Sequence, residues 1–274
     1  MSTISQYGHF DEAQQCFVLT QEPPRKWRNI HYNEIGEHEV YAETSNIGDG
    51  PVVVRDGRGV TCNLVGWDSK YVYVRDDGNG VAFSPWGAPA PQEVQNKQCR
   101  FYAAKTEISS ECNGLRVTQR VFVPRTHVME IWTITIENLL DTPRQLSVFG
   151  YAMFQLTGCD ADGRYVGKEN YAVVMPEIGG TFITNRNPGA PSPRFKGYLV
   201  ALDHFFAGNS YRDQFTRSEF ALGTPKLLWG WNCDNQQAYG PDCAGIVQAK
   251  LTIGPRMTGR VDFLVGQAAS PDDD

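Results

Sequence analysis

Residues 129–156 read MEIWTITIENLLDTPRQLSVFGYAMFQL, and this stretch decides the fold. Apolar and polar side chains alternate over 129–138, which is the period of a β-strand with one buried face. A second strand-like run starts at residue 144, and Asp, Thr and Pro at 141–143 have the composition of a tight turn. The segment therefore predicts two consecutive long strands and no helix.

The rest of the chain repeats this pattern. Asp56-Gly57, Asp77-Gly78 and Asn113-Gly114 stand between alternating runs, where such pairs are the strongest short signals of a hairpin. Residues 6–20 also predict a hairpin, because two strand-like runs flank the polar segment 11–15. Long amphipathic helices are lacking. About fifteen strands follow from these signals, and they predict an all-β fold, a large antiparallel β-sandwich over 1–268.

Three segments are expected to form loops, where binding groups usually lie on a rigid scaffold. Residues 22–46 are polar and aromatic without a period, residues 185–195 are rich in proline, and residues 157–170 separate two clear strands. The last residues, QAASPDDD, follow directly on a strand, and 269–274 have the composition of the start of a linker.

Charge and cysteine content exclude several classes of protein. The net charge is −6 and the basic residues are scattered, so we expect neither a nucleic-acid nor an anionic-membrane partner. No apolar run approaches the roughly 20 residues of a membrane span. The start lacks the features of a secretory signal. Seven cysteines without a Cys-x-x-Cys pair predict a cytoplasmic protein with reduced, mostly buried thiols; Cys233 and Cys243 would pair only in an exported protein.

The sequence contains no recognisable catalytic or metal-binding motif. The stretch CDADGRYVGKE (159–169) places Asp160, Asp162 and Glu169 at three positions of an EF-hand loop, but Gly158 occupies the first position and no helices flank it. We therefore predict no metal site. Asp76-Asp77 is interpreted as a turn. The five histidines have no metal-ligand spacing, and nucleophile-elbow, phosphate-loop and dinucleotide motifs are lacking.

Aromatic residues are the positive signal. Trp132 alternates within a strand and is expected in the core. Trp86, Trp229 and Trp231 lie beside Gly or Pro, where flat rings could pack against the C–H faces of sugars. Core filling is the alternative for each of these tryptophans.

Several ordered segments together resemble the cellobiose phosphorylase family, which is glycoside hydrolase family 94, formerly glycosyltransferase family 36. They cover nearly the whole chain. The matching segments are YGHFD (7–11) with VLT (18–20), Pro24, Trp27 and Asn29, YVYVRDDGNGVAFSPW (71–86), NGLRVTQRVFVP (113–124), the strand pair 130–156 and YRDQF (211–215).

The resemblance implies a super-sandwich similar to galactose mutarotase, followed by a helical linker and an (α/α)₆ barrel that this chain lacks. Family members are homodimers that cleave β-glucosidic di- or oligosaccharides with inorganic phosphate as co-substrate and need no other cofactor. The catalytic acid lies in the barrel, so the resemblance implies no catalytic residue here. It places Lys168, with Arg164 and Tyr165, near the acceptor sugar; the family more often has Arg at the Lys168 position, and Lys offers a point charge instead of a planar fork.

Three hypotheses follow. The first is the N-terminal carbohydrate-binding and dimerisation domain of an inverting glycoside phosphorylase, inactive as a fragment. The second is a standalone carbohydrate-binding module that uses Trp86, Trp229 and Trp231. The third is an aldose epimerase-like enzyme, which would need a His and a Glu in one cleft.

Overall fold

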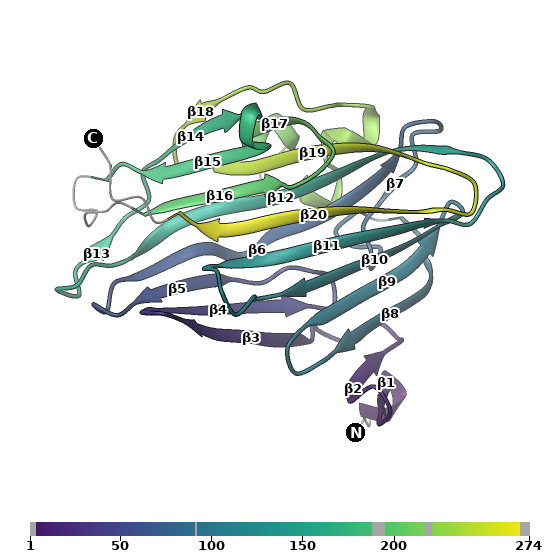
Figure 1. Cartoon of the computed structure of the whole chain (residues 1–274), viewed down its shortest axis with the longest axis horizontal. Helices are drawn as coiled ribbons and strands as arrows, with labels where there is room; N and C mark the ends of the chain where they lie inside the picture. The colour runs from purple at the N-terminus through teal and green to yellow at the C-terminus, as the bar shows by residue number, and fades with distance from the viewer. Residues whose placement is uncertain (1–3, 91, 188–194, 217–220, 269–274) are drawn as a thin grey trace.

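The computed structural model describes residues 4–90, 92–187, 195–216 and 221–268. These residues form two large antiparallel sheets packed face to face, so the predicted all-β sandwich is confirmed (Figure 1). The described strands number twenty rather than about fifteen. The proposed linker at 269–274 lies outside the described residues.

One sheet has eleven strands, and the other has nine. The first runs β1 (Gly8–Asp11), β2 (Cys16–Leu19), β8 (Gln95–Phe101), β9 (Thr106–Cys112), β10 (Leu115–Phe122), β11 (Met129–Asn138), β20 (Thr258–Gln267), β16 (Lys196–Ala201), β15 (Gly180–Asn185), β14 (Asn170–Met175), β18 (Ala238–Tyr239). The second runs β17 (Phe205–Tyr211), β19 (Cys243–Ile253), β12 (Arg144–Cys159), β6 (Thr61–Asp76), β5 (Val52–Asp56), β4 (His38–Ser45), β3 (Arg28–Ile35), with β13 (Tyr165–Val166) on β12 and β7 (Ala82–Phe83) on β6.

The turn at 141–143 carries the chain from one sheet to the other. Strand β11 pairs with β10 and β20, whereas β12 pairs with β6 and β19, so the two strands of the opening stretch lie in different sheets. The three Asp-Gly and Asn-Gly turns close β5–β6, β6–β7 and β9–β10 hairpins as expected, and β1 pairs with β2.

The expectation of an irregular segment at 22–46 is wrong, because most of it forms the β3–β4 hairpin at the edge of the nine-stranded sheet. The inward side chains of β3 include Asn29, His31 and Asn33, which hides the alternation of this strand in the sequence, whereas those of β4 include the buried Val40 and Ala42. His31 and Thr44 are both buried, and they lie near the Lys70 and Glu130 side chains inside the sandwich. A strand that faces a buried polar cluster does not show a hydrophobic period.

The main core lies between the sheets, and a second core covers the outer face of the nine-stranded sheet. Trp132 is 1% exposed in the main core, as predicted. On the outer face, Tyr73, Phe149 and Tyr151 pack against Phe215 and Leu227 from the segment 212–236. This segment contains three short helices, α1 (Arg212–Phe215), η3 (Ala221–Gly223) and η4 (Lys226–Trp229). Two further single-turn helices are η1 (Ile4–Gln6) and η2 (Pro176–Ile178).

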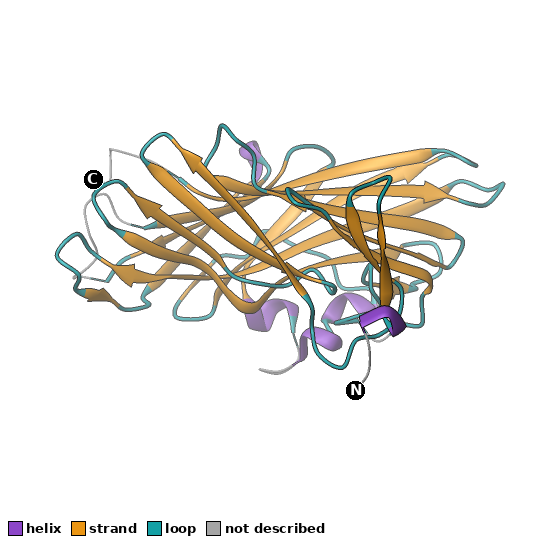
Figure 2. Cartoon of the chain, turned by 90° about the horizontal axis from the view of Figure 1, so that it is seen from below, coloured by secondary structure: helices purple, strands orange, loops and turns teal. Residues whose placement is uncertain are grey.

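Figure 2 shows the helices that cover the second core gathered on one side of the molecule. Within the described residues, no helix is long and apolar enough to cross a membrane. All seven cysteines are free; six are buried and Cys159 is partly exposed, which agrees with the expected mostly buried thiols.

Candidate functional site

The structure separates the sequence-predicted site residues into two groups. Arg164, Tyr165 and Lys168 lie in the connection from β12 to β14, whereas Trp229 and Trp231 lie on the segment that covers the second core. In Figure 1, β13 and β7 mark opposite ends of the molecule. The first group lies at the β13 end, which we call the Lys168 end.

Lys168 is partly buried at this end. Burial lowers the pKa of its ammonium group, and nearby Arg212 adds to the effect while Asp242 opposes it. Arg212 Nη2 lies 3.1 Å from Asp242 Oδ2, so two cationic groups share one carboxylate. Arg164 and Tyr165 are exposed, Tyr165 at 71%. The Lys168 end therefore presents hydrogen-bond donors on Arg164, Tyr165 and Lys168, next to acidic groups such as Glu169 and Asp242.

Two tyrosines beside Lys168 were missed by the sequence analysis. Tyr171 and Tyr239 are 37% and 60% exposed, and their ring centroids lie 6.4 Å apart. The Arg186 guanidinium lies 5.3 Å from the Tyr171 ring centroid, and the Tyr239 hydroxyl donates to Glu169 at 2.9 Å. They escaped detection because Tyr239 belongs to a two-residue strand 68 positions from Tyr171, and only the β14–β18 pairing brings them together.

The acidic residues of the 159–169 stretch stabilise a turn. Asp160 Oδ1 accepts the backbone N–H groups of Asp162 and Arg164 at 3.0 and 2.8 Å. Gly163 adopts a φ of 76°, which favours glycine. Across the described residues, no group of three or more His, Cys, Asp or Glu side chains is arranged to hold a metal ion.

The tryptophans differ in exposure. Trp86 is 2% exposed, its Nε1 donates to Glu22 at 2.9 Å, and it packs with Leu19 and Cys99. The interpretation of Trp86 as a sugar platform is therefore corrected, because its ring is buried in this small core and the Lys97 ammonium lies 4.8 Å from the ring centroid. Trp231 stacks on Phe149, with ring centroids 6.5 Å apart. Trp229 is 54% exposed.

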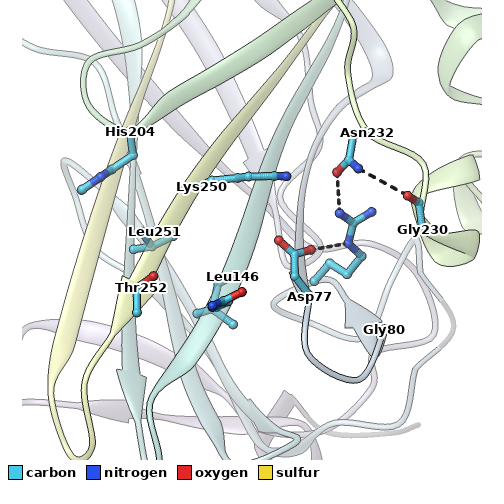
Figure 3. A pocket seen from close by; sticks show the side chains of 11 residues that line it. Asp77, Gly80, Leu146, His204, Gly230, Asn232, Lys250, Leu251 and Thr252 are labelled. Atoms are coloured by element: carbon cyan, nitrogen blue, oxygen red, sulfur yellow. Dashed lines mark hydrogen bonds and ion pairs between the residues drawn. The ribbon is translucent and has the colours of Figure 1, made fainter.

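A polar cleft lies beside Trp229, at the β7 end of the nine-stranded sheet. It has a volume of about 540 Å³, and its lining comes from β6–β7, β12, β19, the β16–β17 turn and the loop after η4 (Figure 3). We call it the Arg75 cleft, and its lining includes the polar residues Arg75, Asp77, Gln145, His204, Asn232 and Lys250.

Arg75 is 4% exposed and fixes one wall of the cleft. Its Nε donates to Asp77 at 2.7 Å, and Nη1 donates to the carbonyl oxygen of Trp231 at 2.6 Å. Its Nη2 donates to Asn232 Oδ1 at 2.7 Å and to Ser147 at 3.4 Å. One guanidinium therefore joins the sheet to the covering segment.

The hydrogen-bond network continues beneath this wall. Ser147 donates to Asp77 at 2.7 Å, and Gln248 donates to Ser147 and to Asn232 Oδ1 at 2.9 and 2.8 Å. Gln248 also accepts the Cys233 backbone N–H at 2.8 Å. Because these groups satisfy one another, the wall is preorganised without a ligand. Four clefts in the described chain have linings that do not combine a His with a Glu, so these clefts give the epimerase hypothesis no support.

The comparisons with known proteins decide the family. The sequence model of the supersandwich domain of glycosyl hydrolase family 94 matches residues 20–273. The chain belongs to this family. The predicted resemblance is thereby confirmed.

Two curated relatives come from Paenibacillus borealis. A 3-O-beta-D-glucopyranosyl-beta-D-glucuronide phosphorylase is 25% identical over 98% of this chain and 34% of its own length. A solabiose phosphorylase is 23% identical over 91% of this chain and 33% of its own length. The chain therefore spans about a third of the length of the relatives it matches.

A solved structure supports the fold. A putative kojibiose phosphorylase from the human microbiome superposes with a TM-score of 0.51 over 98% of this chain and 34% of its own. The identity is 7%, so this similarity concerns the fold alone.

Proposed function

We propose that this chain is the sandwich part of a longer, inverting disaccharide phosphorylase of the cytoplasm, which acts on a β-linked di- or oligosaccharide as a homodimer. Family membership carries the proposal, together with relatives that are named as disaccharide phosphorylases and are about three times as long.

The chemistry of the proposed reaction requires a carboxylic acid and a phosphate. A phosphate oxygen attacks the anomeric carbon from the face opposite the leaving group, the glycosidic C–O bond breaks, and the acid protonates the departing oxygen. We assign both the acid and the phosphate-binding groups to a catalytic (α/α)₆ domain outside this chain. The fragment alone is then inactive, and inorganic phosphate is a substrate; no cofactor is needed.

In this proposal the Lys168 end contributes contacts to the acceptor sugar. A cationic side chain donates to sugar hydroxyls, and the exposed ring surface of Tyr171 and Tyr239 suits packing against sugar C–H groups. The chain also leaves β20 at this end, where the backbone N–H of Ala268 donates to the Lys196 carbonyl oxygen at 3.1 Å. A domain that followed β20 would therefore start near Lys168.

The test is phosphorolysis by the protein with and without its further coding region. The longer protein is expected to release sugar 1-phosphate from a panel of β-linked disaccharides only when phosphate is present, with inversion followed by NMR. The 274-residue chain is expected to release none. Sugar 1-phosphate formed by this chain alone, or hydrolysis without phosphate by the longer protein, would contradict the proposal.

The standalone carbohydrate-binding module remains a second candidate, because Trp229 offers an exposed ring beside the Arg75 cleft. Calorimetric titration of the 274-residue chain with cello-, chito- and β-1,2-oligosaccharides tests it. Millimolar or tighter binding, about −4 kcal/mol or better, would favour the module.

A further inference from the structure

We propose that the Arg75 cleft is a binding site for a hexose unit that carries a carboxylate, such as a hexuronic or aldonic acid, with Lys250 holding the carboxylate. This inference does not depend on the proposed phosphorylase function, because every group it uses lies in the described chain.

Charge favours an anionic ligand. The cation of Arg75 is compensated by Asp77 at 2.7 Å, whereas Lys250 makes no ion pair within the described part of the chain. The Lys250 ammonium instead lies 3.8 Å from the ring centroid of Phe206. The cleft therefore has one positive charge in excess, and a carboxylate placed there gains a charge-assisted hydrogen bond. Figure 3 shows Lys250 extending toward Asp77 and Asn232, while His204 is directed away from them.

Amide and hydroxyl groups around Lys250 suit sugar hydroxyls. Asn232 uses its oxygen to accept from Arg75 and Gln248, but its amide nitrogen has only a 3.5 Å contact to a backbone carbonyl oxygen. The side chains of Gln145 and Thr252 line the cleft and make no hydrogen bonds to other described residues. These donors and acceptors converge on one space, as in sites that fix the orientation of a polar ligand.

The shape of the cleft supports a single sugar unit. A volume of about 540 Å³ lies within the usual range of small-ligand sites, roughly 300–1,000 Å³. The Arg75 network already holds the wall in place, so binding a ligand costs little conformational entropy there. Only Leu146 and Leu251 are apolar side chains in the lining, which argues against an apolar peptide as ligand.

The cleft is distinct from the Lys168 end. Gln145 lies near the start of β12, and Cys159 at its end pairs with Tyr165 of β13. At roughly 3.3 Å per residue, these ends of β12 are about 45 Å apart. One monosaccharide cannot contact both places.

The experiment is a titration of the 274-residue chain, followed by ¹⁵N NMR and calorimetry. The probes are sodium glucuronate, sodium gluconate, glucose and sodium acetate. Glucuronate or gluconate is expected to bind with a millimolar dissociation constant, at least tenfold tighter than glucose and acetate, and to weaken as salt is added. Glucose that binds as tightly as both acids, or an acid that binds no tighter than acetate, would overturn the proposal.

Two variants locate the site. Lys250→Gln is expected to reduce the affinity for the sugar acid about tenfold, to the level of glucose. Lys105→Gln removes a partly exposed lysine that pairs with Glu107 and does not line the cleft, and it is expected to leave this affinity unchanged. Circular dichroism and thermal unfolding verify that both variants fold. Loss of affinity in Lys105→Gln, or none in Lys250→Gln, refutes the assignment to the Arg75 cleft.

Discussion

The Lys70 ammonium lies 2.6 and 2.8 Å from the two carboxylate oxygens of Glu130, and neither side chain has exposed surface. This ion pair joins β6 of one sheet to β11 of the other across the interior. Glu130 also accepts the indole N–H of Trp132 at 2.7 Å, so its carboxylate is well satisfied. Burial lowers the pKa of Lys70, and the charge of Glu130 opposes that shift.

Removing one partner of this pair should strongly destabilise the fold. Lys70→Met leaves the Glu130 carboxylate buried and unpaired, which costs about 3–5 kcal/mol. The double variant Lys70→Met/Glu130→Leu should recover most of this loss, because two apolar groups can replace a buried ion pair. Urea unfolding measures all three proteins. Lys105→Met is the control, because Lys105 pairs with Glu107 at 2.7 Å on the partly exposed surface and should change stability by less than about 1 kcal/mol. A single variant as stable as the control would contradict this reading.

His31 should make stability fall in mildly acidic solution. Burial, with a smaller contribution from Lys70, lowers the pKa of the His31 imidazole to about 4 from 6.5. Between these two pH values the unfolded chain binds a proton at His31 that the folded chain does not. The stabilisation that comes from keeping His31 neutral is therefore complete above pH 6.5 and is lost as the pH falls toward 4. The loss amounts to about 3 kcal/mol. The slope of unfolding free energy against pH between 6.5 and 5, measured for the native chain and His31→Gln, checks it. Equal slopes would show that His31 does not carry the effect.

Much of the fold was predictable because its signals are local. The strand 129–138 alternates, and Asn113-Gly114 closes a hairpin in which Gly114 has a φ of 73°. The β3–β4 hairpin was not predictable, because its inner face is polar where it meets the buried ion pair. On this inner face the polar side chains face Lys70 and Glu130, which lie far away in the sequence.

The candidate site was less predictable than the fold. Arg75 stands in the quoted 71–86 segment, but its partners Trp231 and Asn232 are more than 150 positions away. Tyr171 and Tyr239 meet only through sheet pairing. Trp86 was misjudged because Gly and Pro neighbours indicate a turn and not exposure. Spacing in the sequence carries no information on which loops converge.

Arg75 should hold the covering segment 212–236 in place. Arg75→Ala removes the cation that pairs with Asp77 and leaves the Trp231 carbonyl oxygen without its guanidinium donor, which should cost about 2–3 kcal/mol and expose the segment to protease. Arg58→Ala is the matched control, because Arg58 also pairs with an aspartate two positions away, Asp56, at 2.7 Å, but on the surface. The control should change stability by less than about 1 kcal/mol. Urea unfolding measures the stability of both variants, and limited proteolysis measures how exposed the segment 212–236 becomes. Equal responses of the two variants would mean that Arg75 does not hold this segment in place.

Lys168 should affect acceptor binding in the longer enzyme without affecting proton transfer. Lys168→Gln should raise the KM for the acceptor sugar about tenfold in the synthetic direction, with kcat changed less than twofold, because the group binds substrate and does not react.

The pH dependence separates this role from a structural one. Since burial lowers the pKa of Lys168, its charge is lost at a lower pH than that of an ordinary lysine, and the KM for the acceptor should rise in the alkaline range below pH 10.5. Lys168→Arg keeps the charge and should abolish that rise. Lys226→Gln, which removes a partly exposed lysine from η4, should leave the native profile unchanged. A fall in kcat for Lys168→Gln, or an alkaline rise that persists in Lys168→Arg, would remove Lys168 from the acceptor site.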